Sequence, residues 1–231
     1  MNEQHNTMKA PGKTDFWLII LALGSIAGLI EVIGGGLLRD LKFPYASGLL
    51  TGLGFAIIGF GFAIFKKPVM GIIIGIVAVF CKQLTVPIMH VSVLCGANSC
   101  LAVLLEYGAL SGILAITGSK MHGKTYRRVL MGGSAALISA MAFYFVGLRF
   151  APCNYLLSFR ESGVFSFVVK EGSSWIISSA VLFPIGWIAG QRSADKISLY
   201  LAQRPRMIYG GITLTAIICW MISAIGIAQG M

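Results

Sequence analysis

The chain has 231 residues, of which 57% are hydrophobic and only 11% are charged, and its mean hydropathy is +0.85. Soluble domains carry about a quarter charged residues, so this composition excludes an ordinary water-soluble fold. The net charge of +10 does not indicate a nucleic-acid-binding domain, because Lys and Arg occur in short clusters between long apolar runs.

Seven apolar runs are long enough for transmembrane helices, each of which needs about 20 residues. In chain order we predict helices over residues 16–38, 44–65, 68–94, 100–117, 129–148, 173–190 and 207–228. The third contains Pro87, which favours a kink or break because proline removes a helix hydrogen bond. The sequence therefore predicts an all-α, polytopic transmembrane bundle of about seven helices. We expect one domain over residues 16–231, preceded by a disordered cytoplasmic terminus over residues 1–15.

Basic residues are divided unequally between the two sets of connections. Twelve of the 18 Lys and Arg residues fall on the side of the N-terminus, five fall on the other side, and Lys82 lies within the third helix. Basic connections stay on the cytoplasmic side, so we expect the N-terminus inside and the C-terminus outside. We expect a cell membrane, the inner membrane of a bacterium or archaeon, with the inner basic clusters contacting anionic headgroups. The long connection over residues 149–172 is rich in aromatic residues, which predicts an interfacial helix or a lid.

Charged side chains at membrane depth are costly, so they are the first candidates for function. Glu31, His90 and Glu106 fall in the outer half of the predicted helices, Lys82 falls near the middle of its helix, and Asn98 falls near the outer end. These five residues are therefore predicted to line one polar cavity that is open to the outside and binds a small molecule. The alternative is a buried Glu–Lys ion pair that only fixes the helix register.

Small residues and cysteines give two further predictions. Gly24 and Gly28 form a small-xxx-small pair, which serves either packing within the bundle or docking of a partner subunit. Cys95, Cys100 and Cys153 fall at or near the outer connections. If the outside is oxidising, a disulfide is expected between Cys95 and Cys100, or between either of them and Cys153. The cysteine spacing matches no zinc or CxxC motif, so we expect no metal and no cofactor.

The chain resembles the substrate-binding S component of energy-coupling factor (ECF) transporters, mainly over residues 16–118, in size, glycine-rich apolar composition and layout. Members of that family typically have six transmembrane helices and bind a vitamin, a vitamin precursor or a metal ion in a cavity open to the outside. A transmembrane coupling subunit and two cytoplasmic ATPases power the transport. The family's AxxxA docking motif has its nearest equivalent in Gly24 and Gly28 of ALGSIAGLIE. Two departures are the seven predicted crossings and the start MNEQH, since the nickel and cobalt members carry histidine directly after the first methionine.

The leading hypothesis is a non-enzymatic solute-binding or permease subunit of a nutrient importer. It would use partner ATPases, because the sequence contains no GxxxxGK[ST] motif for ATP hydrolysis. Three alternatives stay open. They are a self-sufficient transporter with a proton on Glu31 or Glu106, a membrane thiol or quinone redox protein using Cys95 and Cys100, and a ligand-free assembly subunit.

Overall fold

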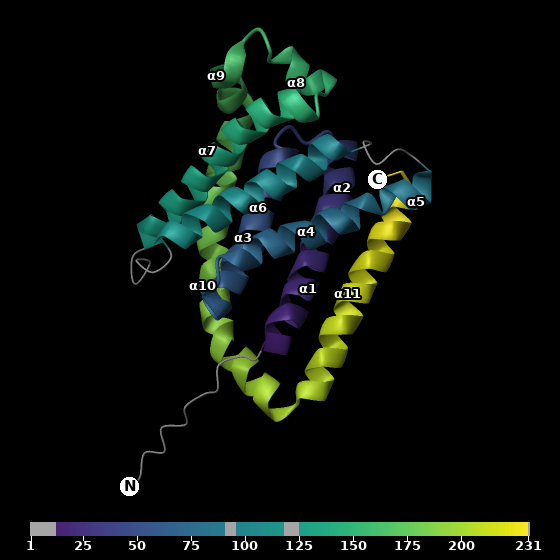
Figure 1. The fold of residues 1–231 in the computed structure, drawn as a ribbon, viewed down its shortest axis with the longest axis vertical. Helices are drawn as coiled ribbons and strands as arrows, with labels where there is room; N and C mark the ends of the chain where they lie inside the picture. Colours follow the sequence, from purple (N-terminus) through teal and green to yellow (C-terminus); the bar gives the residue numbers. More distant parts are fainter. Residues whose placement is uncertain (1–12, 91–95, 118–124, 231) are drawn as a thin grey trace.

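A computed structural model describes residues 13–90, 96–117 and 125–230. No strand occurs among these residues, and seven helical segments are long and apolar enough to cross a bilayer. They run back and forth as one bundle (Figure 1). We call the end at which α1 begins the N-terminal face, and the end at which α11 finishes the C-terminal face. The predicted all-α, multi-pass transmembrane bundle is confirmed, while the assignment of either face to the cytoplasm stays a prediction.

Three spans make up the first part of the chain. They are α1 (Lys13–Leu29), which continues through a π-helical turn η1 (Ile30–Gly34) into α2 (Gly35–Asp40); α3 (Ala46–Phe65); and α4 (Val69–Gln83), followed by the short α5 (Thr85–Met89). Residues 1–12 of the predicted disordered terminus lie outside the described residues, and Lys13–Asp15 already belong to α1.

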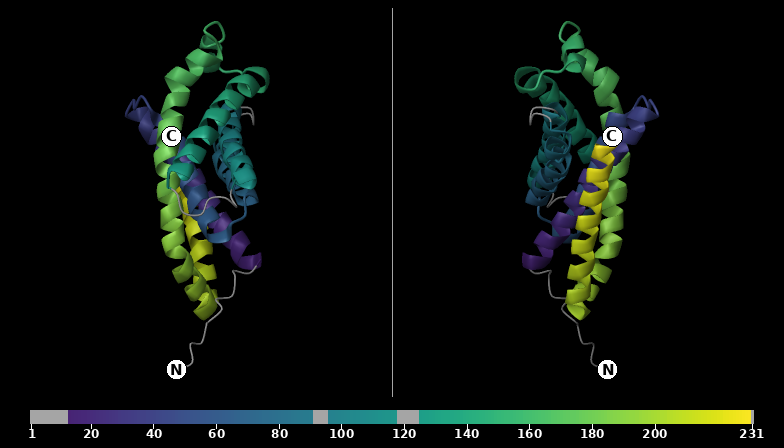
Figure 2. Two further views of the ribbon diagram at one scale, coloured as in Figure 1. Left: turned by 90° about the vertical axis from the view of Figure 1, so that its left-hand side faces the viewer. Right: turned by 90° about the vertical axis from the view of Figure 1, so that its right-hand side faces the viewer.

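Four spans make up the rest of the chain. They are α6 (Ala97–Thr117), α7 (Thr125–Phe150), α10 (Ser173–Gln203) and α11 (Pro205–Ala228). Between α7 and α10 lie α8 (Asn154–Ser158), α9 (Gly163–Phe167) and a second π-helical turn, η3 (Val168–Gly172). The side views in Figure 2 show α8 and α9 at the C-terminal face, beyond the ends of the neighbouring spans.

The helices α3 and α10 run in the same direction and pack most closely through small residues. A Cβ atom added to Gly186 would collide with the carbonyl of Ala56, and one added to Gly190 would collide with that of Phe60. Gly48 and Gly52 meet Ser174 and Ser178 nearer the C-terminal face. Small residues let helix backbones approach and gain van der Waals contact where lipid offers no hydrophobic driving force. This pair forms one wall of the bundle.

From this wall, neighbouring spans pack in the order α3, α10, α7, α6, α4 and α1. The last span, α11, lies along the outer side of α1. Large side chains fill the interior, among them Phe55, Tyr107 and Trp187, which are at most 2% exposed. On α11 the indole N–H of Trp220 donates to Ser25 Oγ at 2.9 Å. The opposite side of α11 exposes large apolar residues such as Leu214 and Met221, as expected of a lipid-facing surface.

Two predicted helices differ most from the structure. The third span, predicted over residues 68–94, has a turn at Leu84, and its last described helix, α5, ends at Met89; residues 91–94 lie outside the described residues. Pro87 lies in the first turn of α5, where the missing N–H costs least. The predicted end of the sixth span at Gly190 was wrong, because α10 continues to Gln203 and carries Arg192 and Lys196, two of the basic residues assigned to an inner connection. Apolar residues such as Ile197 and Leu201 keep one side of this extension packed against the bundle.

The connection over residues 149–172 is mostly helical and packs onto the bundle. Leu156, Phe159 and Phe167 are buried in the core, and the Tyr144 hydroxyl donates to the carbonyl of Phe159 at 3.3 Å. Tyr155 lies on α8, where burial, and then a hydrogen bond and the negative charge of Glu171, raise the pKa of its hydroxyl. These contacts anchor the segment to α7 and α10.

Candidate functional site

A cavity of about 330 Å³ lies at the C-terminal face, where five spans meet. It is lined by polar and small residues of the first, third and fourth spans, and by apolar residues of the second and seventh. The lining residues are Glu31, Val32, Gly35, Gly36, Arg39, Leu50, Lys82, Gln83, Thr85, Gly96, Ser99, Cys100 and Ile227. The volume suits a small molecule at the lower end of the usual size range of ligand pockets.

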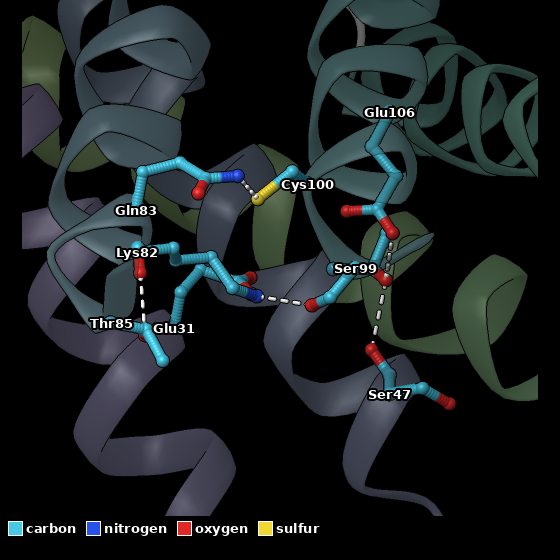
Figure 3. A network of polar contacts seen from close by, with 9 residues as sticks. Glu31, Ser47, Lys82, Gln83, Thr85, Ser99, Cys100 and Glu106 are labelled. Carbon is cyan, nitrogen blue, oxygen red and sulfur yellow. Dashed lines mark hydrogen bonds and ion pairs between the residues drawn. The ribbon is translucent and has the colours of Figure 1, made fainter. Parts of the chain in front are cut away.

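An ion pair between two transmembrane helices forms the polar centre of this cavity (Figure 3). The Lys82 ammonium lies 2.8 Å from the Glu31 carboxylate, and it also donates to Ser99 Oγ at 2.5 Å. The Lys82 side chain is 15% exposed and that of Glu31 is 8% exposed. Lys82 therefore joins the first, third and fourth spans at a point that remains open to the cavity.

Close packing of α1 against α4 sets the register of this ion pair. Gly24 lies against Val77, and Gly28 lies against Cys81, so that a Cβ atom on either glycine would overlap these side chains. The two helices run in the same direction, and Lys82 follows Cys81 directly. Of the two predicted roles of Gly24 and Gly28, packing within the bundle is therefore the one that the structure shows, because α4 covers both residues.

Glu31 lies in the π-helical turn η1, where the regular backbone hydrogen bonding of α1 is interrupted. Such turns insert one extra residue into a helix and often occur at functional sites. Residues 34–36 are all glycine, and Gly35 and Gly36 line the cavity without side chains that would fill it. The local sequence thus leaves space directly beside the carboxylate.

Glu106 lies deeper than the cavity lining. It is 4% exposed, and Thr51 Oγ1 lies 3.1 Å from its Oε1 (Figure 3). The same hydroxyl lies 2.8 Å from the carbonyl oxygen of Ser47, whose own side-chain hydroxyl donates to Glu171 at 3.3 Å. Polar contacts thus connect Glu106, through α3, to the turn η3 that precedes α10.

Gln83 leaves one polar atom unpaired at the cavity. Its amide N–H donates to Cys100 Sγ at 3.3 Å, while its buried Oε1 has no partner among the residues that the structure describes. Exchanging the two amide atoms would leave an unpaired donor in place of the acceptor. Buried polar atoms without partners are rare, so this side chain is suited to a ligand that supplies the missing hydrogen bond.

Besides Glu106, two further predicted site residues do not line the cavity. His90 is exposed, in the left-handed conformation that ends α5, with φ of +50°. Asn98 lies in the first turn of α6, and its amide donates to Cys153 Sγ at 3.3 Å. The structure therefore brings Glu31 and Lys82 together, places Glu106 behind them, and separates His90 and Asn98 from this group.

The cysteine prediction is tested only in part. Cys100 and Cys153 are both free thiols, so the structure does not join them to each other. Cys95 lies outside the described residues, and a disulfide that involves it stays a prediction. Among the described residues no group of three or more His, Cys, Asp or Glu side chains is arranged to hold a metal ion.

Sequence reasoning did not select Thr51, Gln83 or Arg39 as site residues. Arg39 lies at the end of α2 and donates to the carbonyl of Gly230 at 3.0 Å, which ties the C-terminal end of the chain to the cavity. Thr51 and Gln83 are polar residues inside apolar spans, and this is the signal that could have identified them.

No protein-family model, curated protein or solved structure matches this chain.

Proposed function

We propose that the protein binds a small polar solute in the cavity at its C-terminal face, as the membrane subunit of a nutrient importer. The observation that carries this proposal is that the Lys82–Glu31 ion pair lines an open cavity instead of being enclosed between helices. An ion pair that only fixed helix register would need no open cavity beside it, and the buried polar atoms around it would be expected to be paired. Here the neighbouring Gln83 keeps an unpaired atom.

The lining residues define the chemistry of the solute. Lys82 and Arg39 supply positive charge, Glu31 supplies one negative charge, and Ser99 and Thr85 supply hydroxyl groups. Leu50 and Ile227 add apolar surface on the sides formed by α3 and α11. This combination favours a small molecule that carries a carboxylate or similar anionic group together with hydrogen-bonding groups and an apolar part.

The energy for transport would come from partner proteins, as the resemblance to ECF S components implies. In this proposal the cavity opens to the outside, and a transmembrane coupling subunit with cytoplasmic ATPases binds elsewhere on the bundle. Because α4 covers Gly24 and Gly28, such a partner would use an outward-facing surface instead. Purification in mild detergent, followed by protein mass spectrometry, would detect co-purifying ATPases; recovery of the chain alone would contradict this part.

Filling the cavity tests solute binding directly. Leu50→Trp places an indole in the space beside Gly34 and Gly35, whereas Leu214→Trp adds the same ring to the lipid-facing side of α11. Native mass spectrometry and analysis of extracted small molecules would compare the solute retained by each variant. We expect retention by the wild type and Leu214→Trp but not by Leu50→Trp. Equal retention by all three proteins would place the binding site elsewhere.

A second candidate, proton-coupled transport, rests on the arrangement around Glu106. The Thr51 hydroxyl carries one hydrogen but lies within hydrogen-bond distance of two acceptors, the Ser47 carbonyl and Glu106. If that hydrogen goes to the Ser47 carbonyl, the contact with Glu106 is a hydrogen bond only when a protonated Glu106 donates to Thr51. A carboxyl group that holds a proton at membrane depth can release it during transport. In proteoliposomes without ATP, a proton gradient would then drive solute uptake by the wild type but not by Glu106→Gln. Solute uptake at the same rate with and without the proton gradient would contradict this candidate.

A further inference from the structure

A second group of polar side chains lies at the N-terminal face, around the indole ring of Trp187. The Lys66 ammonium lies 4.8 Å from the centre of this ring, and the Arg128 guanidinium carbon lies 5.3 Å from it. Arg128 comes from the first turn of α7 and Trp187 from α10, while Lys66 directly follows α3. Three segments thus bring two cations to one aromatic ring.

This group contains buried donors without acceptors. Arg128 is 8% exposed and Trp187 is 2% exposed, and neither Arg128 Nε nor Trp187 Nε1 has a hydrogen-bond partner among the described residues. An unpaired buried donor is costly, and more so when it carries charge. The group therefore has unfilled capacity for an acceptor.

The positive charge is also unbalanced. Neither Arg128 nor Lys66 is ion-paired with an acidic residue that the structure describes. The connection over residues 118–124, which leads into α7, has no Asp or Glu in its sequence. Partial burial, and then the positive charge of Arg128, lower the pKa of Lys66, as expected for cations that lack a counter-ion.

We propose that Arg128 and Lys66, placed around Trp187, form an anion site whose ligand is a phosphate group. Arg128 is the buried part of the site, and Lys66 is its exposed edge. Phosphate oxygens accept charge-assisted hydrogen bonds from guanidinium groups, and arginine is well suited to this ligand. Lys66 directly follows the span α3, and Arg128 lies in the first turn of the span α7, so we place the site at the level of the lipid headgroups. The phosphate therefore comes either from an anionic lipid or from solution.

Two substitutions and one control test the site. Arg128→Gln removes the buried charge, and Lys66→Asn removes the exposed charge with a residue that tolerates the left-handed φ of +56°. Arg127→Gln removes one charge from the neighbouring half-buried position and serves as the matched control. If Arg128→Gln does not fold, Lys66→Asn carries the test, because Lys66 is exposed.

The measurement is thermal unfolding of the purified full-length protein in neutral detergent, with added phosphatidylglycerol, phosphatidylcholine or inorganic phosphate. We expect phosphatidylglycerol to stabilise the wild type and Arg127→Gln, and to bind Arg128→Gln about tenfold or more weakly, because a charge-assisted hydrogen bond is lost. The same pattern with inorganic phosphate alone would support the site and identify its ligand as soluble. Stabilisation by neither anion, or equal stabilisation of all variants, would overturn the proposal.

Discussion

Breaking the Lys82–Glu31 ion pair from one side should destabilise the bundle strongly. In Lys82→Met the Glu31 carboxylate keeps its position in the π-helical turn, with a side chain that is only 8% exposed, but loses its partner at 2.8 Å. Removing one partner of a buried pair costs about 3–5 kcal/mol. Because the cavity admits solvent beside the pair, we expect a cost at the lower end of that range, about 3 kcal/mol of unfolding free energy.

The double variant Glu31→Gln/Lys82→Met should recover most of this loss. It removes both charges and keeps similar side-chain volumes, so no unpaired charge remains in the bundle, and we expect a cost of about 1 kcal/mol or less. Denaturant titration in mixed micelles would give the unfolding free energies of the four proteins of this double-mutant cycle: the wild type, Glu31→Gln, Lys82→Met and the double variant. If both single variants were as stable as the wild type, or if their losses simply added in the double variant, the two residues would not act as a pair and the reasoning would be refuted.

Three further predictions address packing and the buried carboxyl group. Gly186→Ala should clearly lower the thermal unfolding temperature, because the new Cβ would overlap the Ala56 carbonyl. Gly112→Ala should change that temperature little, because no described atom lies within 4 Å of the position of its new Cβ. Equal effects of the two substitutions would contradict the close α3–α10 contact. Trp220→Phe should cost about 1 kcal/mol in denaturant titration by removing the hydrogen bond to Ser25, while Trp17→Phe, at an exposed position, should cost less. Glu106→Gln keeps a hydrogen-bond donor for Thr51 and should leave the unfolding temperature within a few degrees of that of the wild type. Glu106→Leu has no such donor and should lower the unfolding temperature further. A lower unfolding temperature for Glu106→Gln than for Glu106→Leu would exclude a protonated Glu106.

Much of the fold follows from the sequence because lipid imposes a simple constraint. Each span must satisfy its backbone as a helix, so the seven apolar runs could be located to within a few residues. The ends were less predictable where an amphipathic helix continues past the apolar run, as α10 does from Gly190 to Gln203. In residues 191–203 apolar residues alternate with charged and polar ones, so this part of the helix lacks the continuous apolar run by which we located the spans.

The candidate site could be predicted only in part. Charges at depth identified Glu31, Lys82 and Glu106, and alternation of the spans placed them in the same half of the bundle. Their separation into a cavity pair and a deeper carboxyl group depends on helix rotation, which the hydrophobic pattern leaves open when most sides of a helix are apolar. The sequence also did not reveal that Arg128, within a basic cluster assigned to the surface, is buried against Trp187.

The central claim is that the ion pair belongs to a solute-binding cavity, and solute retention by the double variant tests it most directly. Native mass spectrometry would compare wild type and Glu31→Gln/Lys82→Met after identical purification, once both are shown to be folded. We predict that the wild type retains a small polar molecule and that the double variant does not. Retention of the same molecule at the same occupancy by both proteins would contradict the claim and leave the pair with a structural role alone.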